Sequence, residues 1–422
     1  MRGPDAYPTV SGVAAAARLL SARHPDLCRI RLVGESRAGR PLWLLSVGHG
    51  HRHVLVVAGA NPDQQAGGAT VRWLAEQAVH DRRRLADADL TWDFLLCLDP
   101  DGTVLNETGP AGERPAAVHF RHTYRPAVTD CPEQAAHLPE NRALSAVIDA
   151  LHPELRCTLH GTDVGGSLVR LSADLPGLSE PFGKYAAELD VPVRIGTCEA
   201  PFWASPGPGV YVLPPGAAQR GPDAGPADPA GATWDSPHPH DGLTALVEVP
   251  MWATRRIADP APHPDPGQAV TALAARLRKD GAASLAALER TVALLGDLAD
   301  DPMLRGAEQA AGAFEGLAAR YEALADHAPA PLTMAQVAAF DIAGRRIPLH
   351  ASGMLLRLLD QHRVPVDGDP NSEPARLRSR LERRLDAGAR DLVTTMDARW
   401  VPVGTQAELQ ARTVLATVER LG

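Results

Sequence analysis

The sequence predicts an α/β fold, in which a mostly parallel mixed sheet is flanked by helices, followed by a helical C-terminal extension. Short apolar runs alternate with amphipathic segments in the first part of the chain, and these runs end in turn-forming residues. After residue 266 the pattern changes to continuous helical spacing. The 422 residues are enough for an α/β domain, expected over residues 1–258, and a helical domain over residues 266–422.

The first two expected strands are apolar runs that end in turns. Residues 54–58 form a largely β-branched run that is typical of a buried parallel strand. Residues 66–79 carry apolar side chains on one face, which indicates a helix laid on the sheet. Residues 94–98 lead into the turn sequence of residues 99–102, Asp-Pro-Asp-Gly.

Two further runs, residues 155–159 and 243–247, are each followed by a polar residue, His160 and Glu248. An amphipathic helix is expected before the first of them, over residues 140–151. In open α/β sheets, ligands bind beyond the carboxyl ends of the strands. We therefore expect both polar residues, and the loop after residue 58, to face a functional site.

The C-terminal extension is rich in Ala, Leu and Arg at helical spacing and follows a Pro-rich break at residues 260–266. It is expected to pack on the α/β domain or to build a homo-oligomer. A Pro- and Gly-rich loop is expected over residues 213–242. The sequence fits a lid and a disordered insertion equally well. The expected helices are residues 269–298, 300–327, 334–361 and 373–385.

Five landmarks occur in order along the first 252 residues: the segment 34–42 (GESRAGRPL), the turn 99–102 (DPDG), His160, Tyr211 and Glu248. Together they resemble the zinc metallocarboxypeptidases of the funnelin type, whose patterns are G-x-S-x-x-G-R-P-L and N-P-D-G, with Asp99 here in place of Asn. The resemblance implies that His160 matches the family's distal histidine ligand. Glu248 then matches its general acid and base, and Tyr211 its mobile substrate-side tyrosine.

The resemblance breaks at the metal motif. The family's H-x-x-E falls on Asn61-Pro62-Asp63-Gln64, so that Asn61 replaces a histidine and Gln64 replaces a glutamate. Neutral amides are poor zinc ligands compared with imidazole or carboxylate. We therefore expect no zinc cofactor, and expect Asn61, Asp63, Gln64 and His160 to bind substrate instead. If a metal does bind, the remaining candidate ligands are Asp63 and His160.

The same four residues also have a purely structural interpretation. Asn61 as N-cap, Pro62 at the first helical position and Gln64 at the third would start a helix with a capping box. Under this interpretation the segment no longer takes part in metal chemistry and keeps only its structural role.

Glu248 lies within an apolar run, where an unpaired carboxylate would be costly to bury. It is expected to be a general acid or base, or the partner of an arginine. By resemblance, Arg121 or Arg125 would hold an oxyanion or the substrate carboxylate. Arg142 follows Asn141 and resembles the family's Asn-Arg carboxylate clamp, although this segment also fits a helix start.

The composition bounds the partners and the compartment. A net charge of −9 and a pI near 6.0 argue against nucleic acid or an anionic membrane as a partner. Five cysteines without paired spacing, together with a first segment that lacks a secretory apolar core, predict a cytoplasmic protein.

These features predict a carboxypeptidase-like enzyme that acts on an amide or carboxylate of a small peptide-like substrate, by a metal-independent mechanism in which Glu248 moves protons. Two alternatives are open. One is a pseudoenzyme that binds a carboxylate-bearing ligand or partner without turnover. The other is a zinc-dependent carboxypeptidase whose metal site is rescued by Asp63.

Overall fold

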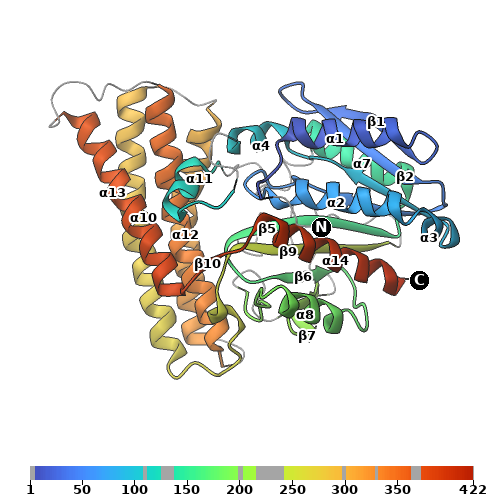
Figure 1. The fold of residues 1–422 in the computed structure, drawn as a ribbon. Helices are drawn as coiled ribbons and strands as arrows, with labels where there is room; N and C mark the ends of the chain where they lie inside the picture. The colour runs from blue at the N-terminus through green and yellow to red at the C-terminus, as the bar shows by residue number, and fades with distance from the viewer. Residues whose placement is uncertain are drawn as a thin grey trace.

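The computed structural model describes residues 5–107, 112–124, 137–197, 203–214, 242–296, 301–327, 331–362 and 372–421. Its centre is a ten-stranded mixed sheet with the strand order β1-β2-β4-β3-β5-β9-β6-β8-β7, and β10 pairs with β9 (Figure 1). The strands are β1 (Cys28–Glu35), β2 (Pro41–Gly48), β3 (Arg52–Val57), β4 (Leu90–Leu95), β5 (Leu155–Gly165), β6 (Leu168–Leu171), β7 (Ala204–Gly207), β8 (Val210–Val212), β9 (Leu243–Ala253) and β10 (Arg399–Trp400).

The four strands expected from apolar runs form the parallel centre of this sheet. β4, β3, β5 and β9 lie side by side and run in the same direction, whereas β2 and β6 flank them in antiparallel pairs. Both β5 and β9 are buried along their whole length, as expected for strands with covered faces. The predicted fold class is confirmed.

Helices cover both faces of the sheet, because alternate strand residues point to opposite sides. Leu55 and Val57 pack in a cluster with the apolar side of α7, whereas Val54 and Val56 pack on the opposite side, with α1 and α2. Outside the C-terminal region, the helices are α1 (Val10–Arg23), α2 (Ala66–His80), α3 (Arg82–Asp87), α4 (Pro100–Asn106), α5 (Ala116–His122), α7 (Pro139–Leu151), α8 (Ser179–Glu188) and the 3-10 helix η3 (Arg255–Ala258).

The C-terminal region is helical, as predicted, but it does not form one separate unit. Four long helices pack into a bundle at the left of Figure 1: α10 (Pro266–Leu295), α11 (Pro302–His327), α12 (Met334–Gln361) and α13 (Glu373–Met396). The chain then returns to the α/β domain, where β10 extends the sheet and α14 (Val403–Leu421) packs on α2 and β9. Residues 399–421, which the sequence places in the helical domain 266–422, thus pack against the α/β layer. Of the predicted loop 213–242, residues 215–241 lie outside the described residues.

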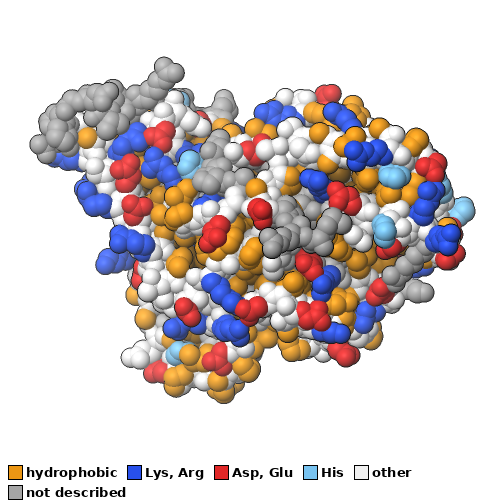
Figure 2. Space-filling model, in the orientation of Figure 1, with side chains coloured by type: hydrophobic (Ala, Val, Ile, Leu, Met, Phe, Trp, Pro, Cys, Tyr) orange, Lys and Arg blue, Asp and Glu red, His pale blue; other side chains and the backbone are white. Residues whose placement is uncertain are grey.

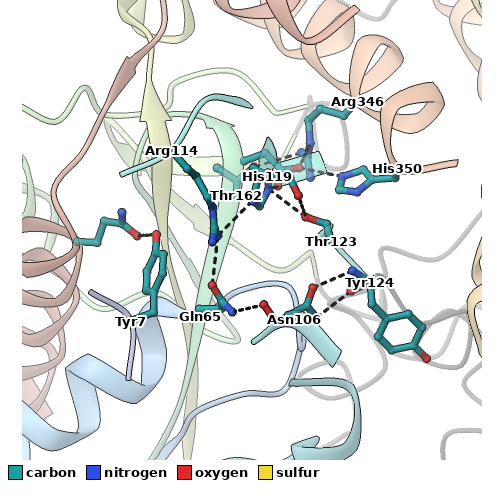
Figure 3. Close-up of polar contacts among 12 residues, drawn as sticks. Tyr7, Gln65, Asn106, Arg114, His119, Thr123, Tyr124, Thr162, Arg346 and His350 are labelled. Carbon is teal, nitrogen blue, oxygen red and sulfur yellow. Dashed lines mark hydrogen bonds and ion pairs between the residues drawn. The ribbon is translucent and has the colours of Figure 1, made fainter. Parts of the chain in front are cut away.

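A buried carboxylate joins the bundle to the sheet. Asp163, near the end of β5, accepts hydrogen bonds from His119 Nε2 of α5 at 2.6 Å, and from Arg346 Nε and His350 Nε2 of α12 at 2.7 and 2.9 Å. Burial opposes the charge, but Arg346 and the histidines hold the pKa of Asp163 well below its usual range. The network continues from His119 through Arg114 to Gln65, which precedes α2 (Figure 3).

On the face of the molecule shown in Figure 2, acidic and basic side chains are interspersed. Among the described helices, none combines the length and apolar character that crossing a membrane requires.

We predict that Asp163→Asn lowers the free energy of unfolding by about 3–5 kcal/mol, because Arg346, whose side chain is largely shielded from solvent, would keep its charge without a counter-charge. Urea titration of the full chain measures this loss. The matched control is Asp190→Asn, since exposed Asp190 also pairs with two arginines, Arg255 and Arg399. Equal losses in the two variants would contradict the assigned role of Asp163.

Candidate functional site

The loop after β3 presents Asn61 toward β5. Residues 61–64 form a turn in which the backbone N–H of Gln64 donates to the backbone carbonyl of Asn61 at 3.1 Å. Helix α2 starts only at Ala66, after an N-cap residue, Gln65, whose side chain makes no capping bond. The capping-box interpretation is therefore wrong, because the Asn61 side chain is directed to a neighbouring strand and not to the helix start.

The partner of Asn61 is His160 of β5. Asn61 Nδ2 lies 3.3 Å from His160 Nδ1, and since an amide nitrogen can only donate, Nδ1 is the acceptor. The imidazole proton is then on Nε2, which is buried and finds no hydrogen-bond partner among the residues that the structure describes. Burial, followed by the charge of Arg170, lowers the pKa of His160 to about 3. The ring is therefore neutral at pH 7 and presents one unused N–H donor.

Gln64 and Asp63 differ in their roles. Gln64 Oε1 accepts a hydrogen bond from the backbone N–H of Gly161 at 3.0 Å, which ties the loop to the residue after His160. Asp63 is buried, and the described part of the chain offers its side chain no hydrogen bond or ion pair. The loop thus contributes two amides that are already engaged and one buried carboxyl group.

Glu248 lies beside His160, because the two residues are register partners on the parallel strands β5 and β9 and share a face of the sheet. Its carboxylate forms a buried ion pair with Arg194, whose Nη1 donates to Oε1 at 2.8 Å. The hydroxyl of Tyr211 donates to the backbone carbonyl of Arg194 at 3.1 Å. The structure therefore brings Tyr211 and Glu248 together through an arginine.

The other predicted arginines are not brought to this cluster. Arg121 pairs with Asp360 of α12 at 2.8 Å and with Glu382 of α13 at 3.7 Å, so its charge serves the contact between α5 and the bundle. Arg142 is exposed on α7, whose buried face is directed to the sheet. Arg121 is therefore engaged in ion pairs with the bundle, and Arg142 lies exposed on α7, so the structure places neither side chain with His160 and Glu248. Arg125 lies outside the described residues.

Arg194 is the residue that sequence reasoning missed. The burial of Glu248 indicates an arginine partner, but 54 positions separate the two residues, and no pattern distinguishes Arg194 from the other arginines. It reaches the site because its backbone bonds to Ser167, which precedes β6, with N–H to carbonyl at 2.8 Å.

These donors do not fit a catalytic zinc ion, which takes three ligands from imidazole, carboxylate and thiolate. The Asn61 amide fills the Nδ1 lone pair of His160, and the Gln64 carbonyl oxygen is bonded to Gly161. Over the described ranges, no three His, Cys, Asp or Glu side chains are grouped so that they could hold a metal ion.

We predict that the neutral state of His160 makes the protein acid-sensitive. In the unfolded chain this histidine takes up a proton below about pH 6.5, whereas in the folded chain its pKa is about 3. Stability is then lost as the pH falls, by about 1.4 kcal/mol per unit over this range. Urea titrations at pH 7 and 5 should show a steeper loss for the wild type than for His160→Gln. The control His51→Gln, at an exposed histidine, should keep the wild-type slope, and parallel slopes for all three proteins would contradict the assignment.

Residues 13–161 match the family model described as zinc carboxypeptidase. A metallo-carboxypeptidase from Burkholderia cenocepacia is 18% identical with a TM-score of 0.37, over 57% of this chain and 60% of that one. Carboxypeptidase A from Helicoverpa armigera is 14% identical with a TM-score of 0.38, over 58% and 65%. A murein-tripeptide amidase from Escherichia coli O157 is 14% identical with a TM-score of 0.28, over 52% and 82%.

The chain thus spans less than two thirds of the length of the first two of these structures. The comparison with curated proteins found no match. The family match covers the strands and loops that deliver Asn61, Gln64 and His160. Residues 13–161 of this chain are therefore similar to the zinc carboxypeptidase family, whose model they match.

Proposed function

We propose that the chain is a carboxypeptidase-like hydrolase that cleaves an amide bond of a small, carboxylate-bearing, peptide-like substrate without a zinc ion. One observation carries the proposal. A neutral imidazole with an unused N–H, that of His160, lies beside the ion-paired carboxylate of Glu248. A hydrogen-bond donor next to a carboxylate is an arrangement that can bind a carbonyl group and activate water.

His160 would bind the substrate carbonyl oxygen. A buried N–H without an acceptor is costly to maintain, so a ligand that supplies an oxygen gains this hydrogen bond at little cost to the protein. Because the ring is neutral at pH 7, the bond does not depend on protonation of the imidazole. As the carbonyl oxygen gains negative charge in the transition state, the bond becomes stronger.

Glu248 would carry the proton. Its carboxylate takes a proton from a water molecule while the water oxygen forms a bond to the carbonyl carbon. The same proton then passes to the amide nitrogen as the C–N bond breaks, so that the products are a carboxylic acid and an amine and Glu248 is again a carboxylate. Arg194 fixes the orientation of Glu248 through the contact at 2.8 Å and supplies positive charge for the substrate carboxylate.

A second function is supported by the same ion pair. Glu248 Oε1 is engaged by Arg194 inside a buried pair, which also fits a group that only shapes a binding pocket. The protein would then bind a carboxylate-bearing ligand through Arg194 and His160 without cleaving it.

We predict that Glu248→Gln lowers kcat by at least about 100-fold on a panel of N-acylated dipeptides and their amides, while KM changes by less than about threefold. Amine release measures turnover, and a zinc chelator should leave the wild-type rate unchanged. The control is Glu188→Gln, which removes the charge of an exposed glutamate that is also paired with an arginine, Arg412. This variant should keep the wild-type rate.

The other outcomes identify the alternatives. Loss of activity on chelation and its return with added zinc would contradict the proposal in favour of a zinc enzyme. Binding of the panel by calorimetry, equal for wild type and Glu248→Gln and without amine release, would favour the binding protein.

A further inference from the structure

The last helix of the chain places a buried glutamine against the backbone of the site. Gln410 of α14 is fully buried, and its Nε2 donates to the carbonyl oxygen of His160 at 2.6 Å and to that of Val247 at 3.2 Å. Its Oε1 accepts a hydrogen bond from the Thr70 hydroxyl of α2 at 2.7 Å. In Figure 1, α14 runs along α2 and across the strands of the sheet.

These three contacts reach the three segments that deliver the site. His160 itself is bonded through its carbonyl, and Val247 is the residue before Glu248. Thr70 lies in the first turns of α2, directly after the loop that carries Asn61 and Gln64. One side-chain amide therefore links β5, β9 and α2 at the level of the site residues.

Packing alone does not require an amide at this position. Val414, one turn after Gln410 on the same face of α14, packs into the apolar cluster with Leu159 and Val247, and so does the adjacent Ala411. An apolar side chain would bury equally well there, whereas an amide is tolerated only when its donors and acceptor are bonded. A satisfied polar group in a core fixes the relative positions of the elements that it bonds.

We propose that Gln410 is a positioning residue, through which the C-terminal helix holds His160 and Glu248 at their working separation. That this separation serves catalysis rests on the proposed function. The placement of the His160 ring by Gln410 does not, because it can be observed without a substrate. The helix after the bundle is then part of the site and not only a cover for the sheet.

The chain supplies a matched control one turn earlier on the same helix. Gln406 is also buried and bonded, but its Oε1 accepts from the Tyr7 hydroxyl at 3.0 Å and its Nε2 donates to the Val401 carbonyl at 2.7 Å. Replacement of either glutamine by methionine removes the same chemistry from the same helix. Only the change at Gln410 removes contacts to the segments that carry the site.

The experiment compares full-length Gln410→Met and Gln406→Met with the wild type. Nitrogen-15 NMR of the histidine rings, with His160 assigned from His160→Gln, reports the tautomer and surroundings of this imidazole. We expect the ring signals of His160 to shift in Gln410→Met and to stay in place in Gln406→Met. If the panel is turned over, kcat should fall by about tenfold or more in Gln410→Met only, because small displacements of catalytic groups are costly. Gln410→Asn, which keeps the amide but shortens its reach, is the second variant if methionine prevents folding.

Two results would separate this inference from the proposed function. Unmoved His160 signals in a folded Gln410 variant, with a loss of stability like that of Gln406→Met, would overturn the positioning role and leave only packing. Shifted His160 signals in a protein that turns over no substrate would support the positioning role and contradict the proposed function.

Discussion

The hydrogen bond from Asn61 to His160 is the interaction on which the chemistry of this site depends. It occupies Nδ1 of the imidazole with an amide hydrogen, which leaves the ring proton on Nε2. Burial then keeps the ring neutral, so a group that resembles a metal ligand in sequence is a hydrogen-bond donor in the structure. The side chain of Gln64 is also engaged, because its carbonyl oxygen accepts a hydrogen bond from the backbone N–H of Gly161 and so holds the loop.

The C-terminal region supports this arrangement from two directions. Arg346 and His350 of the bundle bond Asp163, three residues after His160 on the same strand. Gln410 of α14 bonds the carbonyl of His160 itself. The end of β5 is thus held by side chains that come nearly 200 residues or more later in the chain.

The parts of the fold that could be predicted are those with a local cause. The runs at residues 54–58 and 155–159 are continuous and apolar, and they became β3 and β5 of the parallel centre. His160 and Glu248 lie together as expected, but not at strand ends: both strands continue past them, to Gly165 and Ala253, and the two residues meet because they are register partners on neighbouring parallel strands.

What could not be predicted depends on contacts that are distant in sequence. Arg194 and Gln410 have no local pattern that marks them, and they were found only through Glu248 and His160. The return of α14 to the sheet has the same cause, since its amphipathic pattern fits a bundle as well as a sheet. The capping-box assignment of Asn61 failed because a tertiary partner, His160, outweighed a local preference.

The proposed function requires that two neutral amides, those of Asn61 and Gln64, and not the fold, disfavour zinc binding at this site. The most direct test restores the family motif with Asn61→His/Gln64→Glu and measures zinc binding by calorimetry, with elemental analysis of both proteins after purification. We predict one zinc ion per chain for the double variant and none bound stoichiometrically by the wild type, because the restored imidazole and carboxylate join His160 as ligands. Stoichiometric zinc in the wild type, with an affinity equal to that of the double variant, would contradict the account.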